Sequence, residues 1–481
     1  MYRKEYTETI FRTGSHTSRK SSVKQHEMAA LREMEQMILA AEAVPAGAEA
    51  LERATAHLEQ FLQQVRQKRI LDEKQRAMEA FRQQFENGYT WRNGFLRNVA
   101  RFGDREALIE PESGTVWTYT QLNAEANRFS HALLRAGLQK GDVVMVQLHN
   151  CPEFVFAYLA CHKTGMVFCP VNFRLSAKEI TDCMDNSRPK VFLLEPETQA
   201  EVDMALRRTA HAPQILLTTD ARAAHAYAGF TADCPATEPE LPWELSVYDE
   251  TLRLFTSGTT GRQKSVCLTS INEVLSAHDV MIHFPFSFTD RSMNTTPWFH
   301  RGGLHSGGIT PTLYAGGTVI IQRKFQPEKT LDMVQQYGLT FLIGVPNVLE
   351  LLAEAQQKQP RDLSSLRGIV TMGSPLERAD CIRYQKILTK RIFNGYGTTE
   401  TFWNTFLRPD DLPEMAGSAG RSCVDDDVRV IKVYEDRVAE PDDLAATDGN
   451  EVGEVIIRSN AKSAAFYFGN PAETRRRFHD G

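Results

Sequence analysis

The sequence predicts an α/β protein whose main body contains a largely parallel sheet with helices on both faces. The apolar run Val143–Val146 is typical of a buried strand, and the segment Glu153–Lys163 that follows it is typical of a helix. Strands that alternate with helices in this way form parallel sheets, because the helices cross over the faces to connect the strands. A chain of 481 residues is long enough for two or three domains and a large core.

The composition is that of a soluble globular protein, with 42% hydrophobic and 24% charged residues. The net charge of -6 gives no reason to expect nucleic acid or an anionic membrane surface as a partner. No apolar run approaches the roughly 20 residues of a membrane-spanning helix, and no secretory signal follows the N-terminus. The eight cysteines are scattered without a Cys-x-x-Cys pair, so we expect no zinc site but reduced, mostly buried thiols in a cytoplasmic protein.

The first 88 residues differ from the rest of the chain. Residues 1–24 are basic and rich in Ser and Thr; a transit peptide would look similar, but Glu5 and Glu8 count against one, and we interpret the segment as a disordered tail. Residues 25–88 show helical spacing, broken at Val44–Gly47, and predict a helical hairpin. Its apolar stripe needs a cover: the main body, a second copy in a homodimer, or a separate partner. In the second helix the stripe comprises Leu51, Leu58, Phe61, Leu62, Val65, Ile70, Met78 and Phe81.

The main body begins near Tyr89. A helix is expected from Thr118 to Leu134, closed by Gly137, before the strand and helix named above. Residues 197–250 contain a run of Ala, Pro and Glu, which we interpret as a variable surface excursion without chemistry.

The most informative stretch begins with a strand, Leu252–Phe255. A loop of small residues follows this strand and leads to Lys264. The loop residues are Thr256, Ser257, Gly258, Thr259, Thr260 and Gly261. Small residues let the backbone approach a ligand, successive N–H groups and hydroxyls can surround a polyanion, and Lys264 adds a compact positive charge that suits phosphate. The loop is not a Walker A sequence, because Gln263 stands where that pattern has Gly. A lone Gly-rich loop is more often a surface turn, but nine consecutive residues of this type favour phosphate binding.

This stretch resembles the phosphate loop of the adenylate-forming superfamily, which includes acyl- and aryl-CoA ligases, luciferases and peptide-synthetase adenylation domains. One departure is Gln263, where the family usually has Pro. The resemblance implies an N-terminal domain with two α/β sheet subdomains and a small β-barrel subdomain, here preceded by the helical hairpin extension. The strands Val428–Ile431 and Gly453–Arg458 would belong to that barrel.

A second motif, Thr296–Leu304, resembles the family segment in which an aromatic residue or a His gates the carboxylate pocket, and His300 is the matching residue. A lone His beside aromatic residues is more often part of a core, but the flanking Pro and Gly residues favour the pocket. The implied pocket residues are Trp298, His300, Leu304, Gly307 and Gly308, with the two glycines leaving room for a bulky group. Peptide-synthetase domains for α-amino acids place an Asp near the start of this segment; none is present, which favours an uncharged acyl or aryl acid.

A third motif, Phe393–Glu400, resembles the family pattern Tyr-Gly-x-Thr-Glu. By this resemblance Tyr396 stacks on adenine, Thr399 touches the α-phosphate and Glu400 holds Mg²⁺. A Tyr ring offers a flat face to a base, and a carboxylate is a suitable hard ligand for Mg²⁺. The alternative is a glycine-flanked turn with an exposed Glu. The nucleotide-binding residues implied here are Asn394, Gly395, Tyr396, Gly397, Thr398 and Thr399, joined by Gly373, Ser374 and Pro375 of a looser match to the adenine-side loop.

The resemblance covers residues 89–481, the large N-terminal domain. The segment Asn470–Thr474 and the end of the chain match the stretch before the family's Thr-Gly-Asp, so we expect the ribose-binding Asp and the mobile C-terminal domain, with its adenylation Lys, to be absent. Such a truncated chain is expected to bind nucleotide weakly and to adenylate poorly by itself.

The sequence therefore predicts an ATP-dependent ligase that joins a carboxylic acid to CoA through an acyl-AMP, with ATP, Mg²⁺ and CoA as cofactors. The catalytic residues implied are His300, Lys264, Thr399 and Glu400. Two alternatives stay open: an enzyme that loads the phosphopantetheine of a carrier protein, and a non-catalytic binding module or scaffold. The pocket residues suggest a fatty or aromatic acid without identifying it.

Overall fold

The structure is a computed structural model that describes residues 32, 36, 47–256, 263–459 and 462–479. The expected N-terminal tail, most of the first hairpin helix and residues 257–262 of the expected phosphate loop lie outside these residues. The chain divides into two compact units, Met1–Gln83 and Gln84–Gly481. None of the helices in the described part of the chain is both long and apolar enough to cross a membrane.

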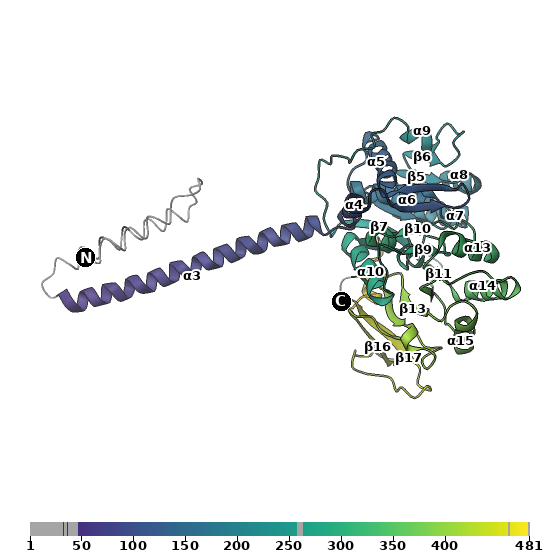
Figure 1. Ribbon diagram of the computed structural model, residues 1–481. Coiled ribbons are helices and arrows are strands. Elements are labelled where there is room, and N and C mark those ends of the chain that lie inside the picture. Colours follow the sequence, from purple (N-terminus) through teal and green to yellow (C-terminus); the bar gives the residue numbers. More distant parts are fainter. Residues whose placement is uncertain (1–31, 33–35, 37–46, 257–262, 460–461, 480–481) are drawn as a thin grey trace. The chain divides into compact units, whose positions relative to one another are not determined.

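The first unit contributes most of one long helix, α3 (Gly47–Gly88), drawn in purple in Figure 1. Within this chain Ile70, Met78 and Phe81 of the stripe are 66%, 61% and 68% exposed, whereas Phe61, Leu62 and Val65 are half-buried, and a cover from a second copy or a separate partner stays a prediction. The two sets differ because apolar residues are spread around the helix. Ile70 and Leu71 are neighbours in sequence and therefore point about 100° apart on the helix.

The first sheet of the second unit has six strands, of which the first five in spatial order are parallel. In that order they are β6 (Ile215–Thr218), β5 (Val191–Leu194), β3 (Val143–Gln147), β4 (Val167–Pro170), β7 (Glu250–Thr256) and β8 (Lys264–Thr269). The expected strand at Val143–Val146 is confirmed as β3, which is buried on both faces, as parallel strands usually are. Residues 197–250 are not only a surface excursion, because β6 forms an edge of this sheet.

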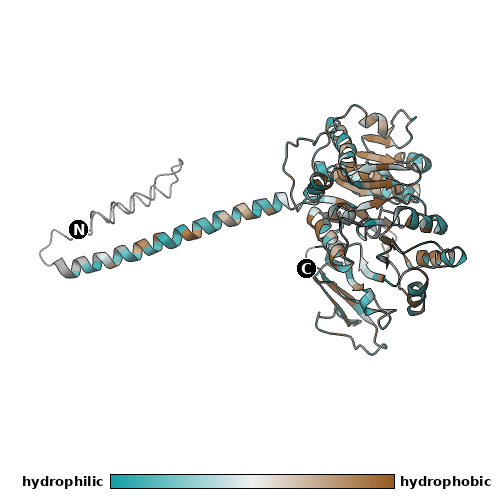
Figure 2. Cartoon of the chain, viewed as in Figure 1, coloured by the Kyte–Doolittle hydropathy of each residue, from teal (hydrophilic) through white to brown (hydrophobic). Residues whose placement is uncertain are grey.

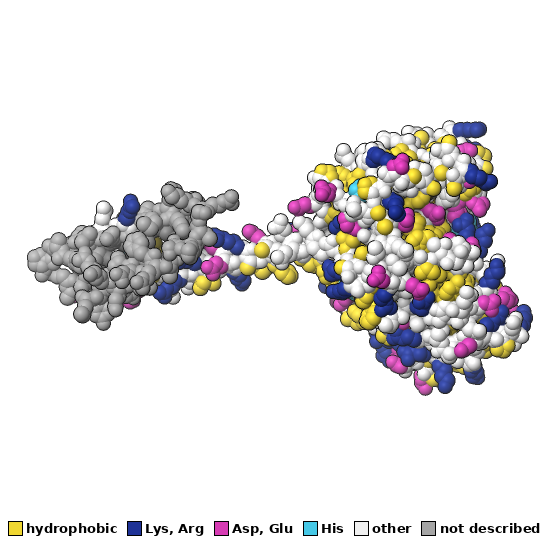
Figure 3. Space-filling model, turned by 45° about the horizontal axis from the view of Figure 1, so that its top comes forward, with side chains coloured by type: hydrophobic (Ala, Val, Ile, Leu, Met, Phe, Trp, Pro, Cys, Tyr) yellow, Lys and Arg dark blue, Asp and Glu magenta, His cyan; other side chains and the backbone are white. Residues whose placement is uncertain are grey.

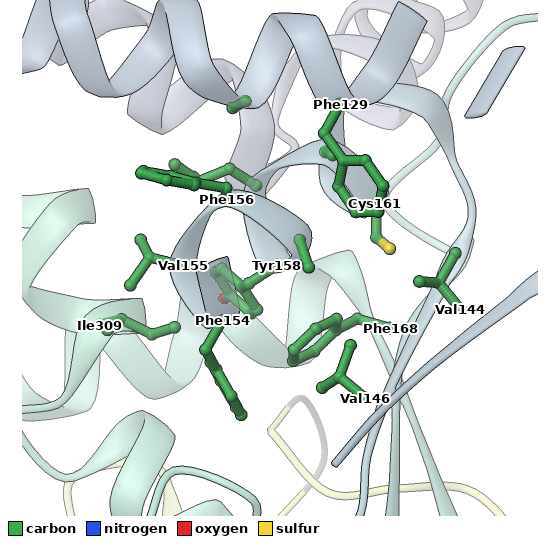
Figure 4. Close-up of a cluster of buried hydrophobic side chains, with 14 of the residues drawn as sticks. Phe129, Val144, Val146, Phe154, Val155, Phe156, Tyr158, Cys161, Phe168 and Ile309 are labelled. Atoms are coloured by element: carbon green, nitrogen blue, oxygen red, sulfur yellow. The ribbon is translucent and has the colours of Figure 1, made fainter. Parts of the chain in front are cut away.

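Helices cover both faces of this sheet, and their ends carry local signals. They are α5 (Tyr119–Arg135), α6 (Pro152–Thr164), α7 (Ala177–Ser187), η1 (Pro196–Thr198), α8 (Gln199–Leu206) and α9 (Tyr227–Thr231). In α5 the Thr118 side chain and Gln121 form a capping box, and α6 ends at Gly165, whose φ of 76° is easily reached only by glycine. Phe154 and Tyr158 of α6 pack edge-on against Phe168 of β4 in the core shown in Figure 4.

The second sheet has nine strands and a parallel centre. In spatial order they are β15 (Arg421–Ser422), β14 (Phe402–Leu407), β13 (Ile392–Thr398), β12 (Gly368–Met372), β11 (Phe341–Gly344), β9 (Arg291–Asn294), β10 (Thr318–Ile320), β1 (Glu106–Glu110) and β2 (Thr115–Thr118). One face packs against α13 (Pro327–Tyr337), α14 (Pro346–Lys358) and α15 (Arg378–Ile387), and the other against α10 (Ser270–His283) (Figure 1). Figure 2 shows the strands as the most apolar elements and the outer helices as more polar.

The remaining elements lie outside these two sheets. They are α4 (Trp91–Phe102), α11 (Arg301–His305), α12 (Ile309–Ala315), η2 (Pro409–Asp411) and α16 (Pro471–Arg477), with β16 (Asp426–Lys432) and β17 (Gly453–Ser459). The two strands expected in the small subdomain pair antiparallel as β16 and β17. All eight cysteines are free and buried. The visible face of the second unit mixes both signs of charge (Figure 3).

Candidate functional site

Two of the predicted motifs lie side by side at the ends of parallel strands. In the pairing of β12 with β13, Met372 lies opposite Gly395. The loop of Gly373, Ser374 and Pro375 that leaves β12 therefore starts beside Tyr396 of β13. Tyr396 is 39% exposed, so a face of its ring is open to a ligand. The ends of parallel strands are where α/β proteins usually bind ligands.

The predicted phosphate loop connects two antiparallel strands. Thr256, the last residue of β7, pairs with Lys264, the first residue of β8. Residues 257–262, which include Ser257, Gly258, Thr259, Thr260 and Gly261, lie outside the described residues. Just beyond Lys264, the Ser265 hydroxyl donates to the Asn186 side chain on α7's last turn, which holds this end of the hairpin.

Lys264 and Glu400 meet at one tyrosine that the sequence analysis did not name. Tyr467 forms a bridge with Val266 of β8, so its ring lies beside the start of that strand. The Lys264 ammonium lies 5.3 Å from the centre of the Tyr467 ring, and the Tyr467 hydroxyl donates to Glu400 Oε1 over 2.6 Å. Burial, together with this hydrogen bond, raises the pKa of Tyr467. The two predicted charges therefore share one site.

Lys264 has a counterion, Glu473 at the start of α16, which the sequence analysis also missed. The same carboxylate accepts from Arg476 over 2.8 Å. Hydrogen bonds from Arg476 and then Lys264 lower the pKa of Glu473 to about 2, so it is ionised at neutral pH. A ligand phosphate that pairs with Lys264 must therefore compete with a carboxylate of this chain.

Replacing Glu473 by Gln is expected to strengthen binding of ATP to the chain by about three- to tenfold, because the neutral amide competes less for the Lys264 ammonium. The measurement is a calorimetric titration with ATP at low ionic strength. Asp332→Asn, which removes a surface partner of Arg361, serves as the control and should leave the affinity unchanged. Weaker binding by Glu473→Gln would mean that Glu473 positions Lys264 for the ligand.

His300 caps the short helix α11. Its Nδ1 accepts the backbone N–H of Gly303 over 3.0 Å, which places the proton of the neutral ring on Nε2. Burial lowers the pKa of His300 to about 4, so the ring is neutral at physiological pH. His300 can thus donate one hydrogen bond from Nε2 without carrying a charge.

The other residues of the predicted acid pocket are tightly packed. Trp298 and Leu304 are 1% and 0% exposed and belong to the core between the sheets. The expectation that Gly307 and Gly308 leave room for a bulky group is wrong. A Cβ on Gly307 would lie 2.7 Å from Ile343, and one on Gly308 would lie 1.9 Å from the Gly303 carbonyl oxygen. These glycines serve close packing of the chain on itself.

Two buried oxygens at the strand ends have no hydrogen-bond partner among the described residues. They are Asn394 Oδ1 of β13 and Thr371 Oγ1 of β12, and the two residues are opposite each other in the sheet. Unpartnered buried polar atoms are rare and mark places where a ligand or water completes the structure. Gly395 and Gly397 lie beyond Asn394, and a Cβ on Gly397 would overlap the Phe402 carbonyl oxygen.

The remaining residues of the third motif form the turn from β13 to β14. Thr398 Oγ1 and Thr401 Oγ1 lie 3.0 Å apart across this turn, with Thr399 and Glu400 between them. The carbonyl oxygens of Thr399 and Glu400 both accept from Arg301, a residue to which the sequence analysis gave no role. The signal for Arg301 in the sequence is its position: a charged residue stands between Phe299–His300 and two glycines.

Asp279, His283 and Cys423 form a separate buried group whose side chains could reach one metal ion. The chemistry of the group argues against that use. Arg408 lies 2.6 Å from His283 Nδ1 and can only donate, so Nδ1 is occupied, and Nε2 already lies 3.2 Å from Asp279 Oδ1. The Lys462 ammonium already lies 2.6 Å from Asp279, and burial raises the pKa of the Cys423 thiol. We interpret the group as a structural link between α10 and the small subdomain.

His305 should make folding stability depend on pH. It is fully buried, and burial lowers its pKa from 6.5 to about 3. Between these values the unfolded chain binds a proton that the folded chain does not, so the free energy of unfolding falls as the pH drops through this window. We expect His305→Gln to reduce the slope by up to about 1.4 kcal/mol per pH unit, as measured by urea unfolding.

The wild type and the His305→Gln variant should differ in slope only below about pH 6.5, since His305 is neutral in both states above it. Identical slopes in the two proteins would contradict the assignment.

Comparisons with known proteins agree with this geometry. The family model described as "AMP-binding enzyme" matches residues 95–467. A feruloyl-CoA synthase from Amycolatopsis sp is 30% identical over 386 residues, which are 78% of this chain and 73% of that protein. An indoleacetate–CoA ligase from Aromatoleum aromaticum is 30% identical over 369 residues, covering 74% and 69%. The crystal structure of the N-terminal domain of FACL13 from Mycobacterium tuberculosis has a TM-score of 0.71 at 25% identity, covering 82% of this chain and 94% of that one.

Proposed function

The chain belongs to the AMP-binding enzyme family, and from this premise we propose that it activates a carboxylic acid with ATP and passes the acyl group to the thiol of CoA. The resemblance seen in the three motifs is thereby confirmed, as is the α/β fold of an adenylate-forming N-terminal domain. Adenylate-forming CoA ligases use ATP, Mg²⁺ and CoA.

The observation that supports the proposal most is the convergence of Lys264 and Glu400 on Tyr467. One ammonium and one carboxylate in a common site suit a metal-bound triphosphate. The phosphate oxygens would attract the Lys264 ammonium, and the metal would attract the Glu400 carboxylate. The orphaned Asn394 oxygen and the partly exposed Tyr396 lie on β13, the strand that leads to Glu400, where a base would add a polar edge and a flat face. The residues present therefore fit the nucleotide and the metal.

In the first step the acid carboxylate attacks the α-phosphorus of ATP, which forms acyl-AMP and releases pyrophosphate. Lys264 would pair with phosphate oxygens, and Thr399 would donate to the α-phosphate. Bound Mg²⁺ supplies neutralisation of the phosphate charge, and Glu400 would hold it. Catalysis of this kind is mainly positioning and charge stabilisation. In the second step the CoA thiol attacks the acyl carbonyl and AMP leaves.

His300 is suited to the carboxylate side of the first step. Its neutral ring can donate from Nε2 to the acid without adding a cation, and Gly303 fixes the ring orientation. It lies directly before Arg301, which contacts the turn of Glu400. We propose His300 as the residue that orients the acid beside the α-phosphate.

The acid that we propose is apolar apart from its carboxylate. The segment around His300 offers no carboxylate that could pair with an amine. Two relatives are named for acids with aromatic rings, feruloyl and indoleacetate. An aryl or arylalkanoic acid is therefore the first class to test.

The experiment is acid-dependent exchange of pyrophosphate into ATP by the 481-residue chain, across aryl, arylalkanoic and fatty acids. Thioester trapping with CoA, and separately with a phosphopantetheinylated carrier protein, then identifies the acceptor. A thermal-shift titration with ATP and Mg²⁺ reports binding without turnover. We expect slow but measurable exchange with at least one acid, a small thermal shift with ATP, and trapping by CoA. A chain with no shift and no exchange would be a scaffold, and trapping by the carrier alone would make it a carrier-loading enzyme.

A further inference from the structure

Arg301 is a buried arginine to which the proposed reaction assigns no task. Its side chain is 2% exposed, and burial lowers its pKa to about 9. In the part of the chain that the structure describes, it forms no ion pair with a carboxylate. Nearby carboxylates partly offset the effect of burial on this pKa; they are Glu273, Glu400, Asp279 and Asp426. A buried guanidinium without a direct ion pair still needs hydrogen-bond acceptors, because desolvation of a charge is otherwise very unfavourable.

The acceptors are drawn from three separate segments. One terminal nitrogen of Arg301 donates to the carbonyl oxygens of Thr399 over 2.6 Å and Glu400 over 2.9 Å. The other donates to the Lys462 carbonyl over 2.6 Å and to the Ser276 hydroxyl over 3.1 Å. The planar fork of arginine thus ties the β13–β14 turn to α10 and to the segment that leads to Tyr467.

The turn that Arg301 holds is strained. Phe402, which follows it, has a φ of 62°, a left-handed conformation that large side chains rarely adopt. The Arg301 guanidinium lies 5.4 Å from the centre of the Phe402 ring, and Ala464 N–H also donates to the Glu400 carbonyl over 2.7 Å. Contacts from outside the turn therefore keep it in a shape that its own sequence does not favour.

The same contacts determine where the Glu400 carboxylate points. Its backbone carbonyl is fixed by Arg301 and Ala464, and its side chain by the Tyr467 hydroxyl. Arg301 also directly follows His300 in a closely packed segment, where a Cβ on Gly303 would lie 1.9 Å from the Pro297 carbonyl oxygen. The same segment therefore contains His300, which we propose orients the acid, and Arg301, which holds the Glu400 turn.

We propose that Arg301 is a positioning residue that fixes the Thr399–Glu400 turn so that the Glu400 carboxylate meets the metal of the nucleotide, and that it couples this turn to the His300 segment. The inference rests on the proposed function, because it needs a metal-bound nucleotide at Glu400. Arg301 itself touches neither the substrate nor the metal in this scheme; it acts through the backbone of the turn.

The test compares ATP affinity with and without Mg²⁺ in the wild type, Arg301→Gln and Arg301→Lys. We expect Arg301→Gln to lower the affinity for ATP with Mg²⁺ by about tenfold and the affinity for ATP alone by less than about threefold. Arg301→Lys should be intermediate at best, because an ammonium cannot reproduce the planar fork. The matched control is Arg361→Gln. Arg361 is also a mostly buried arginine that donates to a backbone carbonyl, that of Gln359, but it lies far from Arg301 in the sequence.

A double-mutant cycle with Glu400→Gln separates positioning from general destabilisation. If Arg301 acts through Glu400, adding Arg301→Gln to Glu400→Gln should cause no further loss of the Mg²⁺ effect. Equal losses with and without Mg²⁺, or an unchanged Mg²⁺ effect in Arg301→Gln, would overturn the inference while the wild type still binds ATP. A wild type without Mg²⁺-dependent ATP binding would refute the proposed function and this inference together. If Arg301→Gln does not fold, Arg301→Lys is judged by the same criteria.

Discussion

Replacing Lys264 by Met should lower the rate of acid-dependent pyrophosphate exchange by about a hundredfold or more, since it removes the ammonium that we propose pairs with the phosphates and that now pairs with Glu473. The variant should fold, because Glu473 keeps its hydrogen bonds to Arg476. The freed carboxylate would also repel the triphosphate, so both ATP binding and turnover should fall. Exchange kinetics and an ATP titration measure the two effects.

Lys190→Met is the matched control for Lys264→Met. Lys190 also pairs with one carboxylate, Asp142, over 2.7 Å, but it lies at the start of β5 and away from the motifs. The control should exchange pyrophosphate like the wild type. If Lys264→Met keeps wild-type exchange, the phosphate charge is neutralised elsewhere and the proposed role of Lys264 is wrong.

Replacing Glu400 by Gln should also reduce exchange by about a hundredfold or more, through loss of the proposed metal ligand. The amide can still accept from the Tyr467 hydroxyl, so the local structure should persist. The Mg²⁺ concentration that gives half-maximal activity should rise together with the loss in rate. A Mg²⁺ titration of exchange activity measures both quantities.

Glu350→Gln is the control for this substitution, because Glu350 likewise accepts from a tyrosine hydroxyl, that of Tyr384, over 2.9 Å. It lies on α14, which connects β11 to β12, and it belongs to none of the three motifs. The control should keep the wild-type Mg²⁺ dependence. An unchanged Mg²⁺ dependence in Glu400→Gln would show that another residue holds the metal.

Local patterns predicted the strands that carry the motifs. The expected strand at Leu252–Phe255 lies within β7, and the expected strand at Val143–Val146 lies within β3. The helix expected at Glu153–Lys163 is confirmed as α6. These segments are buried on both faces or show a clear period, so short stretches of sequence contain enough information to assign them.

Other features depend on contacts that no local pattern contains. The apolar residues of α3 look like a stripe when read as a list, but their angular positions scatter them around the helix. Gly307 and Gly308 looked like space for a ligand, whereas neighbouring backbone and Ile343 occupy that space. Whether a glycine makes room for a ligand or for the chain itself depends on what folds against it.

The sequence by itself determined the α/β class, the order of the three motifs and the identity of the charged residues offered to a nucleotide, because periodicity and small-residue turns are local properties. The tertiary structure decided which charges meet. Lys264 and Glu473 are 209 residues apart, and Arg301 and Thr399 are 98 apart. Such pairs form only when the sheets pack and desolvate them, and that packing makes Tyr467, Glu473 and Arg301 part of the site.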